Sequence, residues 1–530
     1  MDQKNPEHSR FSIEYRITLQ DSRSIEEVTR DICVEQTVEI PYEFIPRGHF
    51  TAGLIGRVEN VRALDDQNRW SVSISYRSDC TAFSIPQLLN VLYGNISLKT
   101  GIRITGLELD TALQNAFAGP QYGCTGIRSE LGLYGRPLAC TALKPMGLSS
   151  KELAELAGKF ASGGIDLIKD DHGITDQQFH PFEERVARCQ DAVESAYLRT
   201  GKKTLYFPMV AGRYDQIEKQ VQFAVKQGVR GILIAPMLVG LDTMRYLGET
   251  YSIMIMAHPA LTGSFFSNRD DGIDPEVMLG TIFRLAGSDI SIFPNWGGRF
   301  PLSRENCLGI ADALRRRQYD WKPAFPCPAG GMNLNRIEEM GKAFGEETVL
   351  LIGGALLDPS KNVTDTTTEF MDTLRHLFAE RREIPAGFVS SCSWNTSVQK
   401  DCVQSILTCN KYRWSGRTMV DYKQDSSIPF KNIARSELIG SFGESTSFDL
   451  RYFEIEPGGY SSFEKHIHEH VIIGVRGEGK LVKADCLLSI KEHDVAYVAP
   501  LEPHQLKNDG PVPFGFFCIV DHVRDKPQQV

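Results

Sequence analysis

Residues 138–169, LACTALKPMGLSSKELAELAGKFASGGIDLIK, contain two apolar runs separated by a segment of helical pattern. Ser149 and Glu152 are spaced as a capping box, and the apolar residues from Leu153 to Phe160 recur at helical spacing. The runs LACTAL and IDLIK are continuously apolar, as strands are when both faces of a parallel sheet are covered. The stretch therefore predicts a strand, a helix and a second, parallel strand.

Six further apolar runs follow, each separated from the next by a segment long enough for a helix. They are TLYFPMV (204–210), GILIAP (231–236), IMIMAH (253–258), ISIFP (290–294), AFPCP (324–328) and VLLIGG (349–354). Eight strand–helix units of this length predict an α/β fold, a (β/α)8 TIM barrel. An open doubly wound sheet is the alternative, but no G-x-G-x-x-G motif follows the first strand.

The remainder of the chain does not follow this repeat. Residues 1–135 contain the alternating stretch RWSVSISYR and a helix-like IPQLLNVLYGN, which predict an α+β domain. We expect the barrel over 136–385 and a linker over 386–440, where the pattern dissolves. Residues 441–530 contain short β-rich runs separated by turn sequences, which predict a small all-β barrel.

Composition limits the classes of function. The chain has 530 residues, enough for two or three domains, and a net charge of −9, which argues against a nucleic-acid partner. No run reaches the roughly 18–20 apolar residues of a membrane helix, and the polar start does not resemble a signal peptide. Twelve scattered cysteines without a CxxC pair indicate reduced thiols. We therefore expect a cytoplasmic protein with no membrane association.

Polar residues and glycines gather where the predicted barrel strands end, and these ends form the active-site face of a TIM barrel. Lys169 and Asp171 are two residues apart and would face the same side of an extended strand, whereas Asp170 would face away. One interpretation is a Lys–Asp ion pair at the rim. In the other, Lys169 carries a carbamate and, with Asp171, holds Mg2+, which prefers oxygen ligands. The other polar and glycine positions are Lys144, His172, His258, Asn295, Gly330, Gly331, Gly353 and Gly354.

The C-terminal region has a second group of metal-ligand residue types. Glu464, His466, His468 and His470 alternate along one run, and His504 follows in PLEPHQLKN. A solvated charged strand is the plain interpretation. Histidines at i, i+2 and i+4 on one strand face instead favour a transition-metal site.

Several linked motifs resemble the large subunit of ribulose-bisphosphate carboxylase over roughly the first 380 residues. They are LLNVLYGN, GPQYG, YGRPLACTALKPMGLS, GGIDLIKDD, MAHPAL, AGSDISIFPN, PAGG and LLIGG. The resemblance implies that Lys169 is the carbamylated metal-binding lysine, Asp171 a metal-binding aspartate and Lys144 a proton-transfer lysine. It also implies a catalytic His258 and a catalytic Asn95, which in the family serves the neighbouring subunit, so we expect a homodimer. Substrate-binding positions would be Asn295 and the phosphate-binding glycines Gly330, Gly331, Gly353 and Gly354.

Three departures from the carboxylases matter. Pro259 stands where they have an arginine, and the run ISIFPNWGGRF lacks both the strand-six histidine and the following lysine that orients CO2. Loss of that lysine removes an electrophilic stabiliser of the carboxylation transition state. His172 stands in place of a glutamate ligand and would be either a metal ligand or an acid/base group. This pattern resembles the RuBisCO-like proteins, which enolise but do not carboxylate.

The C-terminal run resembles the two cupin motifs over about residues 450–510. The resemblance implies a metal site of Glu464, His466, His470 and His504, with His468 as a possible replacement for Glu464, suited to Mn2+, Fe2+, Ni2+ or Zn2+. The two resemblances together imply an isomerase of 5-methylthioribulose 1-phosphate in methylthioadenosine salvage, joined to a cupin that releases methanethiol. The alternatives are a decarboxylase or enolase of another phosphorylated keto-sugar, or a non-catalytic protein that binds a sugar or a metal.

Overall fold

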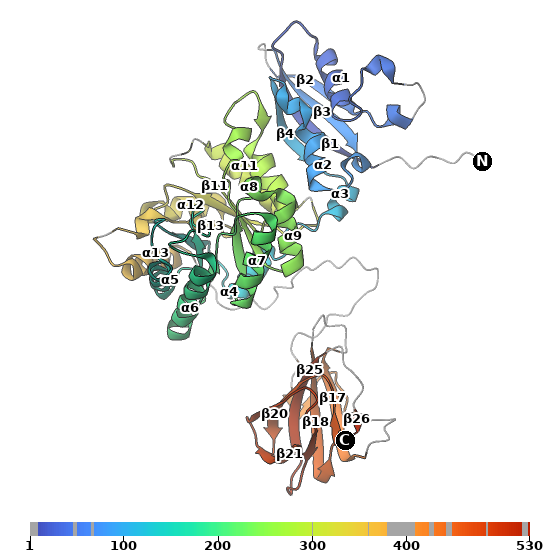
Figure 1. Ribbon diagram of the computed structural model, residues 1–530, viewed down its shortest axis with the longest axis vertical. Coiled ribbons are helices and arrows are strands. Elements are labelled where there is room, and N and C mark those ends of the chain that lie inside the picture. The colour runs from blue at the N-terminus through green and yellow to red at the C-terminus, as the bar shows by residue number, and fades with distance from the viewer. Residues whose placement is uncertain are drawn as a thin grey trace, which may run out of the picture. The chain divides into compact units, whose positions relative to one another are not determined.

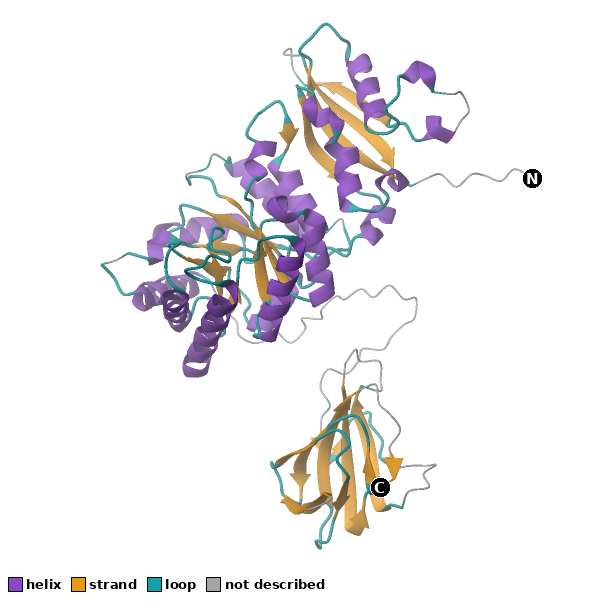
Figure 2. Cartoon of the chain, viewed as in Figure 1, coloured by secondary structure: helices purple, strands orange, loops and turns teal. Residues whose placement is uncertain are grey.

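The computed structural model describes residues 9–45, 50–64, 68–298, 300, 302–317, 319–358, 360–378, 407, 409–422, 429–440, 448–483, 486–521 and 528–529. The chain divides into two compact units, residues 1–389 and 390–530, each with its own secondary structure (Figures 1 and 2). In the described ranges, no helix combines the length and the apolar character needed to cross a lipid bilayer.

The eight predicted strands form one parallel sheet in the order β7-β6-β5-β13-β12-β11-β9-β8. A bridge between Met209 and Leu233 joins its two ends and closes the barrel. The prediction of a (β/α)8 barrel is thus confirmed. The strands are β5 (Leu138–Leu143), β6 (Leu167–Asp170), β7 (Leu205–Phe207), β8 (Gly231–Ile234), β9 (Met254–Ala257), β11 (Ile290–Pro294), β12 (Phe325–Ala329) and β13 (Val349–Leu351).

Helices follow the strands and surround the barrel (Figure 1). They are α5 (Ser150–Gly163), α6 (Phe182–Thr200), α7 (Tyr214–Lys226), α8 (Pro236–Val239), α9 (Leu241–Tyr251), a π-helical turn (Glu276–Ile282) continuing into α10 (Phe283–Leu285), α11 (Arg304–Arg315), α12 (Ile337–Phe344) and α13 (Val363–Leu377). The predicted capping box starts α5, where the Ser149 hydroxyl accepts the backbone N–H of Glu152. Gly164 ends this helix in the left-handed conformation, at φ 86°.

Alternate residues along each strand fill the barrel interior. Cys140, Leu167, Phe207, Met256 and Cys327 belong to one buried cluster, while the residues between them pack outward against the helices in a separate core. The period of two therefore decides which side chain at a strand end enters the mouth of the barrel.

The N-terminal α+β domain has a five-stranded sheet in the order β10-β4-β1-β3-β2. Its elements are β1 (Arg10–Thr18), α1 (Ile25–Glu35), β2 (Arg57–Ala63), β3 (Arg69–Arg77), α2 (Ile85–Tyr93) and β4 (Ile102–Glu108), followed by α3 (Thr111–Ala116) and α4 (Gly123–Leu131). The strand and helix predicted here correspond to β3 and α2. The edge strand β10 (Gly272–Ile273) comes from much later in the chain and pairs in parallel with β4.

The second unit is an antiparallel all-β barrel (Figure 2). Its strands are β14 (Cys409–Asn410), β15 (Arg413–Trp414), β16 (Val420–Asp421), β17 (Lys431–Ile439), β18 (Phe448–Tyr460), β19 (Glu464–Lys465), β20 (His470–Arg476), β21 (Gly479–Lys483), β22 (Cys486–Ile490), β23 (Val495–Val498), β24 (His504–Lys507), β25 (Phe514–Asp521) and β26 (Gln528–Gln529).

Part of the segment predicted as a linker belongs to this second unit. β17 pairs with β18 along most of its length, and Tyr422 lies in the apolar core between the strands. Residues 386–406 of the predicted linker lie outside the described residues. Polar composition concealed the contribution of β16 and β17 because a short strand at a barrel edge carries few apolar residues.

Candidate functional site

Three of the predicted side chains face the inside of the large barrel at the carboxyl ends of its strands. Lys169 follows the inward Leu167 by two residues, and His258 follows the inward Met256 by two. Lys144 has the same parity as Cys140, and its Nζ lies 3.4 Å from the position that a Cβ on Gly353 would take. The ends of β5, β6, β9 and β13 thus meet around one mouth.

Lys169 and Asp171 form the charged centre of this mouth. The Lys169 side chain is buried, and its Nζ donates to the backbone oxygen of Asp170 at 3.0 Å. Burial lowers the pKa of Lys169, which favours the neutral amine that can react with CO2. The pKa of Asp171 is lowered by a hydrogen bond from His172 and by the charges of Lys169 and Lys144. Asp171 is therefore an anion beside a buried lysine.

Two histidines stack at the edge of this group. The rings of His172 and His258 lie 4.4 Å apart at 11° to one another, and His172 Nδ1 is 3.6 Å from an Asp171 oxygen. Burial lowers the pKa of His258 to about 2, so its imidazole is neutral. The N–H of Ala260 donates to His258 Nδ1 at 3.1 Å, which leaves Nε2 to carry the proton. His258 is therefore a neutral hydrogen-bond donor.

The other predicted barrel residues divide between the mouth and other places. Gly330 and Gly331 have φ of 97° and 71°, and Gly353 and Gly354 follow β13. Asn295 lies outside the mouth: its position in β11 has outward parity, and its Nδ2 contacts Met340 Sδ of α12 at 3.0 Å.

Asn95 lies in the N-terminal domain, directly after α2, and its Nδ2 donates to Glu35 at 3.0 Å. It is thus held by the α1 side of its own domain.

The donor set of the mouth fits Mg2+. This ion is typically bound through one or two carboxylates and keeps several waters. Asp171 supplies one carboxylate, and Lys169 would supply a second anionic oxygen group once carbamylated. The buried lysine and the carboxylate beside it are the observation on which this fit rests.

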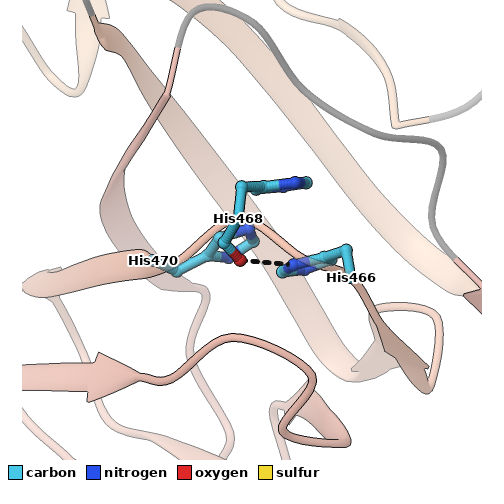
Figure 3. Close-up of side chains that lie close together, drawn as sticks. All are labelled: His466, His468 and His470. Carbon is cyan, nitrogen blue, oxygen red and sulfur yellow. Dashed lines mark hydrogen bonds between the residues drawn. The ribbon is translucent and has the colours of Figure 1, made fainter.

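The second unit brings three histidines together. The ligand atoms of His466, His468 and His470 all lie within 4.8 Å of one another, and in the described part of the chain no other group of three such residue types does so. Figure 3 shows the three rings around the turn before β20, with His466 Nδ1 donating to the backbone oxygen of His468 at 2.8 Å.

Two nitrogens in this cluster have no hydrogen-bond partner. They are the Nε2 atoms of His466 and His470, both buried. Burial lowers the pKa of His466 to about 4 and also lowers the pKa of His470, so both rings are neutral, the form that binds metals. Buried polar atoms are nearly always satisfied, and a bound ion is one explanation for exceptions. The cluster therefore fits a transition-metal ion.

His504 and Glu464 lie beside this cluster. The ring of His504 is 4.9 Å from that of His466 and 5.2 Å from that of His470, and Glu464 pairs with His504 across β19 and β24. The Glu464 carboxylate accepts hydrogen bonds from Ser462 at 2.7 Å and Tyr422 at 3.5 Å. The geometry thus groups His468 with the other two histidines and engages Glu464 elsewhere. Sequence reasoning missed Tyr422 and Ser462, since neither lies in a motif.

Comparison with known proteins agrees with this architecture. Residues 123–295 match the family model "Ribulose bisphosphate carboxylase large chain, catalytic domain", and residues 451–520 match the model "Cupin domain". The crystal structure of a Rubisco-like protein from Rhodopseudomonas palustris superposes with a TM-score of 0.63 at 36% identity, over 69% of this chain and 97% of that one. The chain belongs to the RuBisCO-like proteins.

Two RuBisCO-like relatives have named activities. The 5-methylthioribulose-1-phosphate isomerase of Rhodospirillum rubrum is 37% identical over 350 residues, 66% of this chain and 92% of the relative. The 2,3-diketo-5-methylthiopentyl-1-phosphate enolase of Geobacillus thermodenitrificans is 34% identical over 290 residues, 54% of this chain and 70% of the relative. This RuBisCO-like chain therefore resembles enzymes that act on methylthio-sugar phosphates, and it carries a cupin domain in addition.

Proposed function

We propose that the large barrel is an isomerase that converts 5-methylthioribulose 1-phosphate to 1-methylthioxylulose 5-phosphate through an enediolate, in methylthioadenosine salvage. The observation that carries the proposal is the inward-facing group of Lys144, Lys169, Asp171 and His258. A cation ligand pair, a basic side chain and a neutral donor are what proton transfer next to a carbonyl requires.

The roles divide among these side chains. Mg2+ held by carbamylated Lys169 and by Asp171 would polarise the substrate carbonyl and make the neighbouring C–H more acidic. Lys144, or the carbamate on Lys169, takes the proton from that carbon and returns it to the adjacent one. His258 donates its Nε2–H to a substrate oxygen. His172 is either a further metal ligand or an acid/base group, and the backbone N–H groups around Gly330, Gly331, Gly353 and Gly354 bind phosphate.

Asn295 keeps only an indirect part in this proposal. Its side chain packs outward, so it supports the loop after β11 instead of contacting substrate. Asn95 serves the site of a neighbouring subunit, which makes the working form at least a homodimer. The ten cysteines in the described residues are all free, which supports a cytoplasmic location.

For the cupin domain, we propose a methylsulfurylase that releases methanethiol from the product of the barrel. His466, His470 and His504, with His468 or Glu464, would hold Mn2+, Fe2+, Ni2+ or Zn2+. The support for a metal is the pair of buried, unpartnered Nε2 atoms. Placing two consecutive activities on one chain is consistent with a shared methylthio-sugar phosphate.

Phosphorus NMR of the purified protein with 5-methylthioribulose 1-phosphate tests the barrel activity. Conversion to 1-methylthioxylulose 5-phosphate is expected for the wild type and for Lys151→Met, which changes an exposed lysine on α5, but not for Lys144→Met. The enolase relative supports the second candidate function. An unchanged phosphorus spectrum here, together with turnover of 2,3-diketo-5-methylthiopentyl 1-phosphate, would establish an enolase instead.

A further inference from the structure

One arginine contacts three backbone and side-chain groups around the loop that carries Asp171 and His172. Arg185 lies in the first turn of α6, and its side chain is fully buried. Its Nε donates to Asp170 Oδ2 at 3.1 Å, and its Nη1 donates to the backbone oxygens of Thr175 and, at 2.9 Å, His180. Arg185 thus holds the start and the end of the loop at once.

The carboxylate of Asp170 connects this arginine to the next barrel strand. Asp170 has outward parity, between the inward Lys169 and the loop residue Asp171. It accepts the hydroxyl of Tyr206 at 2.8 Å and the N–H of Met209 at 3.0 Å. Because all of these groups are buried, their hydrogen bonds are not exchanged for water, and the end of β6 is fixed against β7.

The same loop is also fixed to the preceding strand. His180 Nδ1 is 3.0 Å from the backbone oxygen of Leu148, in the loop that begins at Lys144 after β5. His180 Nε2 is 2.7 Å from Gln177 Oε1, and Gln177 Nε2 donates to Gly173 O at 2.8 Å. The carboxyl ends of β5, β6 and β7 are therefore linked through one buried network.

We propose that Arg185 is a positioning residue, which acts through Asp170 and the 171–181 loop to hold Lys169, Asp171 and His172 in the geometry that proton transfer needs. The inference rests on the proposed isomerase function. Lysine does not replace arginine here, because a single ammonium group lacks the planar fork that reaches a carboxylate and two carbonyls at once. A displacement of about 1 Å in a catalytic group can lower a rate by roughly 100-fold.

The opposite end of β6 provides a matched control. There Arg136 donates to both oxygens of Asp166, at 2.7 and 2.8 Å, and both side chains are buried. Residues at the amino ends of barrel strands serve stability, whereas those at the carboxyl ends serve catalysis. The two arginines thus share burial, an aspartate partner and a strand, but only Arg185 contacts the loop of the mouth.

The experiment compares Arg185→Lys with Arg136→Lys in the full chain. Thermal unfolding, hydrogen–deuterium exchange of residues 171–181, and kcat and KM for 5-methylthioribulose 1-phosphate are measured. Both variants should lower the unfolding temperature. Only Arg185→Lys should speed exchange in the loop, at least tenfold, and lower kcat about 100-fold per folded molecule while KM changes less than threefold.

Equal effects of the two variants on loop exchange and kcat would overturn the proposal, as would normal kcat in folded Arg185→Lys. If Arg185→Lys does not fold, Tyr206→Phe removes one hydrogen bond to Asp170 and should give smaller changes in the same direction; unchanged exchange and kcat there would also overturn it. A wild type that does not turn over this substrate refutes the proposed function, and the exchange of residues 171–181 then decides the role of Arg185 alone.

Discussion

Nickel should raise the unfolding temperature of the cupin unit and leave that of the large unit unchanged, and His466→Leu should abolish the increase. The two units have separate hydrophobic cores, so calorimetry should resolve two transitions. Nickel prefers imidazole nitrogen, and without bicarbonate the large barrel offers it only the one carboxylate of its ligand pair. The variant removes one of the two unpartnered buried nitrogens of the cluster.

The size of the effect follows from the site. Each unsatisfied buried polar atom destabilises a fold by roughly 1–3 kcal/mol, and a metal at this site would satisfy two of them. Nickel at about one hundred times its Kd stabilises the native form by about 2.7 kcal/mol. A domain near one hundred residues gains about 4 °C for each kcal/mol, so the cupin transition should rise by roughly 11 °C.

The assay is differential scanning calorimetry of three proteins, each with nickel and with a chelator. The proteins are the wild type, His466→Leu and His493→Asn. His493 is an exposed histidine of the same unit with φ of 72°, and asparagine tolerates that conformation. The control should retain the full increase. The reasoning is refuted if His466→Leu keeps the increase, or if both transitions of the wild type rise together.

Three further predictions concern the large unit. Lys169→Ala should lower isomerase kcat by at least about 1,000-fold, and wild-type activity should rise with bicarbonate and Mg2+; near-normal turnover by the variant would contradict the carbamate. The wild type should not incorporate labelled CO2 into acid-stable product from ribulose bisphosphate, because Pro259 replaces the phosphate-binding arginine; any such incorporation contradicts this. Light scattering should give at least a dimer, and Asn95→Ala should lower kcat without dissociating it; a fully active monomer would argue against a shared site.

The sequence predicted the barrel because its strands are buried on both faces, so each is a continuous apolar run that local composition reveals. The same period of two predicts that Lys144, Lys169 and His258 face inward, when counted from Cys140, Leu167 and Met256. Counting along β11 would also have excluded Asn295, which we grouped with the mouth only because it follows a strand.

Other features had no local signal. Tyr422 reaches Glu464 from a polar segment more than forty residues away, and only closure of the second barrel brings them together. The choice between Glu464 and His468 depended on the turn before β20, because a turn changes which alternate residues share a face. Arg185 was equally invisible, since a buried arginine in a helix has the same sequence pattern as an exposed one.

The pairing of β10 with β4 affects how the chain is made. β4 is an edge strand until residues 272–273 reach it, because Ile104 pairs with Ile273. A ribosome adds about 5–20 residues per second, so roughly 170 residues of synthesis leave that edge open for about 8 to 34 seconds. An uncovered edge strand is a site for pairing with other chains. Nascent N-terminal domains on neighbouring ribosomes are therefore exposed to mispairing, and a chaperone that binds extended segments would protect them until β10 arrives.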